Sequence, residues 1–130
     1  MPLNLAEICF LNSIVQFQFL PKAQKEDSKE DLFLFEKVLG VIFEVTWRKL
    51  KEKKKLFTIA DRTTKNLLVR EGHAYILYTD LFKYQGKFDY VEINGEEELK
   101  NLMSKTNAKA IAVTDGPSHP AIIPIPQENN

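Results

Sequence analysis

The segment from Leu32 to Trp47 constrains the fold most, because nearly all of it must be kept away from water. Twelve of its sixteen residues are apolar when the methyl group of Thr46 is counted. A helix that is apolar around most of its circumference has to be covered on more than one side. One sheet in a domain of 130 residues does not easily cover that much surface, so a second copy or another protein is expected to cover the rest; the alternative is a central strand after Gly40, which needs no partner. The residues expected in this contact are Phe35, Leu39, Ile42, Phe43 and Trp47.

Two secondary structures remain open for this segment. Ser28 and the acidic Asp31 three residues later have the spacing of a helix N-cap, so a helix begins near residue 29. The helix either continues to about Lys54, or ends at Gly40 and is followed by a strand over residues 41–47, where apolar residues alternate. Residues 51–55 contain no glycine, proline, asparagine or aspartate and therefore make a poor hairpin turn. We favour the long helix.

Residues 48–55 form a dense basic segment in a chain whose formal net charge is zero. The segment carries +5, from six basic residues and Glu52, and the rest of the chain carries −5. Such a segment either binds the phosphates of a nucleic acid in a salt-dependent, sequence-independent way, or forms the solvated end of a helix, where the dipole favours cations. Its basic residues are Arg48, Lys49, Lys51, Lys53, Lys54 and Lys55.

The N-terminal region has a clear start and an ambiguous continuation. Asn4 and Glu7 have the spacing of a capping box, which predicts a helix that begins directly after the asparagine. Over residues 15–19 apolar and glutamine residues alternate, so the chain is either a strand there or one continuous apolar helix. Pro21 is expected to end either element. Residues 22–29 are polar and charged, which predicts a surface loop.

The second half of the chain reads as strands around one helix. Strands are predicted at 56–60, 66–70, 73–80, 88–93, 108–114 and 121–125, and a helix at 96–105, capped by Asn94. Turns are predicted at Glu71-Gly72, at Gln85-Gly86 and at residues 115–117, and the prolines in the last strand confine it to a sheet edge. The predicted fold class is α+β, a single domain over residues 1–126 with an antiparallel-dominated mixed sheet of about five strands and helices mainly on one face. Residues 127–130 are expected to be a frayed tail.

One loop combines residue types that occur in active sites. Asp115, Ser118 and His119 follow the strand predicted to be most buried, and ligands often bind at the ends of such strands. The three residues lie too close in sequence to converge as a catalytic triad, so we regard them as a candidate ligand loop and predict no catalytic residues. The chain has one cysteine and two histidines, too few for a zinc site, and no glycine-rich phosphate loop, so we expect neither a metal nor a cofactor.

The order of helix, strand meander, helix and strand is similar to that of the restriction-endonuclease-like core. Nucleases of that kind place an acid-x-lysine triplet beside a bound metal. The nearest triplets here, Asp80-Leu81-Phe82 and Glu92-Ile93-Asn94, lack the lysine. The resemblance therefore implies at most an inactive relative that holds nucleic acid through residues 48–55.

Composition and charge complete the sequence-based hypothesis. A single cysteine and no secretory signal predict a cytoplasmic protein. The apolar stretch over residues 8–20 is interrupted by polar residues and is too short to cross a bilayer, so no membrane insertion is expected. We expect a non-enzymatic, adaptor-like protein-interaction domain that forms a homo-oligomer through residues 32–47. The alternative is a nucleic-acid-associated protein.

Overall fold

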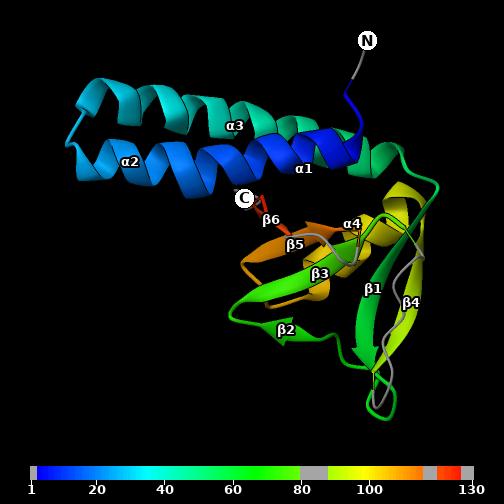
Figure 1. Cartoon of the computed structure of the whole chain (residues 1–130). Coiled ribbons are helices and arrows are strands. Elements are labelled where there is room, and N and C mark those ends of the chain that lie inside the picture. Colours follow the sequence, from blue (N-terminus) through cyan, green and yellow to red (C-terminus); the bar gives the residue numbers. More distant parts are fainter. Residues whose placement is uncertain (1–2, 80–87, 116–119, 127–130) are drawn as a thin grey trace.

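The computed structural model describes residues 3–79, 88–115 and 120–126, and it has the predicted α+β class (Figure 1). The helical elements are α1 (Leu5–Ile14), the π-helical turn η1 (Val15–Phe19), α2 (Leu20–Lys25), α3 (Lys29–Glu52) and α4 (Gly95–Lys105). The strands are β1 (Lys55–Asp61), β2 (Val69–Arg70), β3 (His73–Leu77), β4 (Phe88–Asn94), β5 (Ala110–Thr114) and β6 (Ala121–Pro124).

The strands form one mixed sheet in the order β4-β1-β3-β5-β6, with β2 paired to β3 beside this path. The β3–β5 pair is parallel, with Tyr75 opposite Ala112, and every other pair is antiparallel. A parallel pair needs a long crossover, and here β4 and α4 provide it between β3 and β5. Strand β6 lies at an edge of the sheet, as Pro124 and Pro126 predicted.

The helices pack on one face of the sheet, where they enclose the main core. In Figure 1, α1, η1 and α2 form one long arm that runs antiparallel to α3. This helical hairpin lies over β5 and β6. Helix α4 contacts both β4 and α3. The buried core cluster combines helix and strand residues: Leu5, Cys9, Trp47, Leu50, Leu56, Ile76, Ile93, Leu99, Ile111, Val113, Ala121 and Ile123.

The N-terminal arm decides between two alternatives and corrects one prediction. Of the alternatives for residues 15–19, the continuous helix is right, because Val15 is buried while Phe17 and Phe19 are exposed, which leaves a strand no buried face. The prediction that Pro21 ends the helix is wrong. The π-helical turn lets the Leu20 N–H donate to the Val15 carbonyl, and Pro21 then falls in the first turn of α2, where its missing N–H costs little.

The expected loop over residues 22–29 is also wrong in most of its length. Lysine, glutamine and glutamate are good helix formers, and α2 continues to Lys25. Only three residues separate α2 from α3, and Asp27 among them adopts a positive φ of 53°. The two helices therefore form a tight hairpin.

Helix α3 is the long helix that we favoured. The Ser28 side chain accepts a hydrogen bond from the Asp31 N–H at 3.3 Å, as its cap spacing predicted. Gly40 lies within the helix, and a Cβ built there meets no atom within 4 Å. The helix ends at Glu52, close to the expected end, with Lys49 and Lys51 in its last turn.

The predicted turns and caps that lie in the described residues are largely confirmed. Asn4 and Glu7 form the capping box, with both hydrogen bonds present. Glu71 and Gly72 adopt φ values of 54° and 82°, as a type I′ hairpin turn requires. The strand predicted at 66–70 is shorter than expected, because β2 covers only Val69–Arg70. At the start of α4 the Asn94 side chain makes no capping hydrogen bond, and the Glu98 carboxylate instead accepts from the Asn94 N–H at 2.6 Å. The turn at Gln85-Gly86, residues 116–117 of the next turn and the tail at 127–130 lie outside the described residues.

Candidate interaction surface

Most of the exposed apolar side chains of α3 line one side of the helix. Three of them, Leu34, Val38 and Val41, are 54%, 37% and 61% exposed, and the half-buried Val45 completes the row; Phe33, also exposed, lies to the side of it. Spacings of four, three and four residues place side chains on the same side of an α-helix. We call these four residues the α3 stripe.

The α3 stripe faces away from the sheet. Leu50 follows Val41 by nine residues, which is about two and a half helical turns, so the two side chains point to opposite sides. Leu50 is fully buried in the core beneath the helix. A second body can therefore approach the stripe without disturbing the core.

Charged residues lie at both ends of the α3 stripe, mainly acidic at one end and mainly basic at the other, with Lys29 and Glu52 as the exceptions. Glu30 and Asp31 lie at the N-terminal end, and both are exposed. Arg48, exposed, and Lys49, half-buried, lie at the C-terminal end. Within the described part of the chain, the ion pairs are Lys55–Glu92, Arg62–Asp89 and Lys100–Glu96, and none of them involves α3. These four charges are thus available to a partner.

The residues that the sequence singled out for interaction point largely inward. Leu39 and Trp47 are buried, and Phe35, Ile42 and Phe43 are half-buried. Phe35 stacks on Phe19 of the N-terminal arm with 5.5 Å between ring centroids. The Trp47 indole N–H donates to the Pro124 carbonyl at 2.9 Å. The α3 stripe is not among the residues predicted from the sequence, although its i, i+4, i+7, i+11 spacing is present in the same segment.

The N-terminal arm carries a second exposed apolar row. Phe10 and Phe17 are 65% and 60% exposed, and Leu3 precedes Phe10 by the same seven residues. Leu3, Phe10 and Leu11 also line a shallow groove on α1. Among the described residues, the large apolar side chains that are exposed all lie on or next to the helical hairpin, with the exception of Val91 on β4.

The six residues of the basic segment surround the end of α3. Its last turns carry Arg48, Lys49 and Lys51. Around the helix axis, Lys49 lies about 100° from Arg48, and Lys51 lies about 200° from Lys49. Lys53 and Lys54 lie in the connection to β1, and Lys55 begins that strand and pairs with Glu92 at 3.5 Å. Because three of the six residues follow the helix, no single face of α3 carries all six. Their binding to nucleic acid stays a prediction.

Of the candidate ligand loop, only Asp115 lies in the described residues, and Ser118 and His119 fall outside them. Asp115 is half-buried next to two titratable groups, Cys9 and Tyr78. Burial first, and then the Asp115 charge, raises the pKa of Cys9 to about 11. Burial, Cys9 and Asp115 raise the pKa of Tyr78 to about 12. Both groups are therefore protonated at neutral pH, and the thiol is a poor nucleophile.

The raised pKa of Cys9 predicts a loss of stability at alkaline pH. Below pH 9 the thiol is protonated in both the folded and the unfolded chain, so the protonated thiol makes its full contribution to the free energy of unfolding. Between about pH 9 and 11 the unfolded chain releases the proton and the folded chain keeps it, which lowers the free energy of unfolding by about 2–3 kcal/mol. Urea denaturation across this range should show the fall for the wild type and a smaller one for Cys9→Ala. Parallel curves for the two proteins would contradict the assignment.

Two kinds of site are not found in the described residues. None of the described helices is both long and apolar enough to cross a membrane. No group of three or more histidine, cysteine or acidic side chains in the described part of the chain is arranged to hold a metal ion.

No protein-family model matches the chain, and neither a curated protein nor a solved structure is significantly similar to it.

Proposed function

We propose that the protein is a self-associating interaction module, and that two copies pair through antiparallel α3 helices. The observation that carries this proposal is the α3 stripe itself, an exposed apolar row with acidic residues at one end and basic residues at the other. The zero net charge of the chain adds no repulsion between copies.

The apolar residues of the stripe are arranged symmetrically. With a two-fold axis between Val38 and Val41, Val38 of one copy lies opposite Val41 of the other. One turn further out, Leu34 lies opposite Val45. A two-fold interface needs such a self-complementary surface, in which each contact occurs twice. The resulting contact has the alternating layers of an antiparallel helix pair.

The charges at the ends follow the same symmetry. Glu30 and Asp31 of one copy come opposite Arg48 and Lys49 of the other, and the arrangement repeats at the far end. A parallel pair would instead bring the acidic ends together and the basic ends together, which like-charge repulsion disfavours. Charge complementarity therefore selects a second copy of this chain in antiparallel orientation as the occupant.

Charge reversal tests this register directly. One variant carries Glu30→Lys with Asp31→Lys, and the second carries Arg48→Glu with Lys49→Glu. Each variant alone brings like charges together in the antiparallel pair, so its self-association should weaken by about tenfold or more. An equimolar mixture of the two should associate as a heterodimer with near wild-type affinity. Sedimentation equilibrium measures all three.

The outcomes separate the proposal from its alternatives. If the wild type remains a monomer at concentrations up to about 1 mM, where even an association worth about 4 kcal/mol is visible, the proposed function is wrong. If the wild type associates and both variants associate equally well, the contact lies elsewhere, and the exposed row on α1 becomes the next surface to examine.

A further inference from the structure

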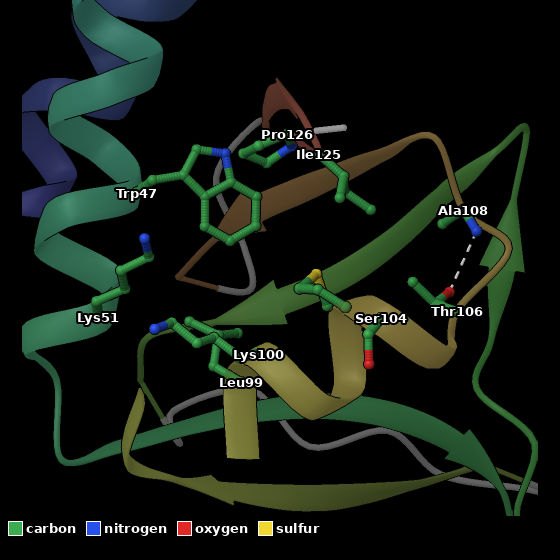
Figure 2. A pocket seen from close by; sticks show the side chains of 10 residues that line it. Trp47, Lys51, Leu99, Lys100, Ser104, Thr106, Ala108, Ile125 and Pro126 are labelled. Atoms are coloured by element: carbon green, nitrogen blue, oxygen red, sulfur yellow. Dashed lines mark hydrogen bonds between the residues drawn. The ribbon is translucent and has the colours of Figure 1, made fainter. Parts of the chain in front are cut away.

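A cavity of about 390 Å³ lies between the C-terminal half of α3, helix α4 and the chain that follows β6 (Figure 2). Its apolar wall is formed by Trp47, Leu99, Met103 and Ile125. Ligand sites for small molecules occupy about 300–1,000 Å³ and are mostly apolar with a few placed polar groups. The cavity falls at the lower end of this range.

Two lysines supply the charge of the cavity. Lys51 from α3 and Lys100 from α4 both line it, and Figure 2 shows their side chains extending from the two helices that flank the cavity. None of the lining residues is acidic. Lys100 makes one exposed ion pair with Glu96, at 3.4 Å within the same helix, and exposed pairs of this type contribute little. Both ammonium groups are thus accessible to an anion in the cavity.

Both hydroxyl groups that line the cavity, of Ser104 and Thr106, make hydrogen bonds within the chain. Ser104 donates its hydroxyl proton to the Asn101 carbonyl at 2.9 Å. The Thr106 hydroxyl oxygen accepts from the Ala108 N–H at 3.2 Å, so its own proton remains available to an acceptor. The polar groups of the cavity therefore favour a ligand that accepts hydrogen bonds and carries negative charge.

We infer that this cavity binds a small organic anion, a carboxylic acid with an aromatic or branched aliphatic body. The carboxylate meets the ammonium groups of Lys51 and Lys100, and the apolar body packs against Trp47 and Met103. The cavity is too small for a folded partner, and a compact inorganic anion leaves the apolar wall without contact. This site does not depend on the α3 stripe, because Trp47 lies on the side of α3 that meets the core.

The position of Trp47 makes the site directly measurable, because it is the chain's single tryptophan. Its fluorescence should change on titration with 4-phenylbutyrate. The neutral amide of the same compound should bind about tenfold more weakly or not at all, because it lacks the charge. The affinity for the acid should also fall as salt is added.

Variants assign the binding to the two lysines. Lys51→Met and Lys100→Met keep most of the side-chain stem and remove the charge, and each should weaken 4-phenylbutyrate binding by about tenfold. Lys105→Met, at the end of α4 and outside the cavity lining, should leave it unchanged. Three results would overturn the inference: equal affinity for the acid and the amide, equal loss of affinity in all three variants, or no fluorescence change up to about 10 mM acid. That concentration is well above the Kd of a useful site.

Discussion

Leu50→Ala is expected to lower the free energy of unfolding by about 2–5 kcal/mol, the range typical of a leucine truncated in a packed core. Leu50 is fully buried and belongs to the cluster in which α1, α3, α4 and the sheet meet. Removing its side chain leaves a cavity at that junction, and the neighbours come from different elements, so they cannot all move to fill it. The loss is a large fraction of the stability of a small domain. Urea denaturation followed by circular dichroism measures it.

Phe33→Ala is the matched control, since it truncates a larger apolar side chain on the same helix. Phe33 is 64% exposed and contacts the Lys37 amine at 5.3 Å from its ring centroid. We expect a change of less than about 1 kcal/mol, because little apolar area leaves water there on folding. Similar losses for the two variants would mean that α3 is not oriented as described.

The double substitution Val38→Glu with Val41→Glu should abolish self-association. These residues lie at the centre of the proposed two-fold contact, so the change places four carboxylates close together in an apolar interface. Desolvation and mutual repulsion both oppose pairing, and we expect the Kd to rise by about a hundredfold or more. Both positions are exposed within one copy, so the free energy of unfolding of the monomer should change little. Sedimentation velocity over a concentration series measures the association.

Val91→Glu supplies the comparison at a distant exposed valine. Val91 lies on β4 and is 41% exposed, close to the exposure of Val38. Self-association should remain at the wild-type level in this variant. If Val91→Glu disrupts it as strongly as the double substitution, the sheet rather than α3 forms the contact, and the proposed pairing is wrong.

Short-range signals predicted the helix starts because the interactions involved span only a few residues. The capping box of Asn4 and Glu7 and the cap of Ser28 are local hydrogen bonds. The turn at Glu71-Gly72 needs two positive φ angles, and glycine supplies one of them cheaply. Pro21 misled because a proline usually ends a helix, and here a π-helical turn precedes it. No local pattern announces that turn.

Which apolar row of α3 is exposed could not be predicted from the sequence. Helix α3 carries two apolar rows side by side: the α3 stripe, and the row that includes Phe35, Leu39 and Ile42. The two rows have nearly the same hydrophobicity and spacing. The residues predicted from the sequence belong to the row that packs mainly inside the subunit, because hydrophobicity alone does not say which row meets the sheet.

By itself, then, the amino-acid sequence determined the fold class, the capping of the start of α3 and the edge position of β6, whereas it left the extent of α3 open between a long helix and a helix followed by a strand. The fold class follows from the order of helices and strands along the chain, the cap from residues within one turn, and the edge position from the missing N–H of Pro124. Only the tertiary structure decided which side of α3 stays in water, that β3 pairs in parallel with β5, and that Lys51 and Lys100 share one cavity. These features join residues far apart in the chain, and packing among distant elements selects them after local preferences are satisfied.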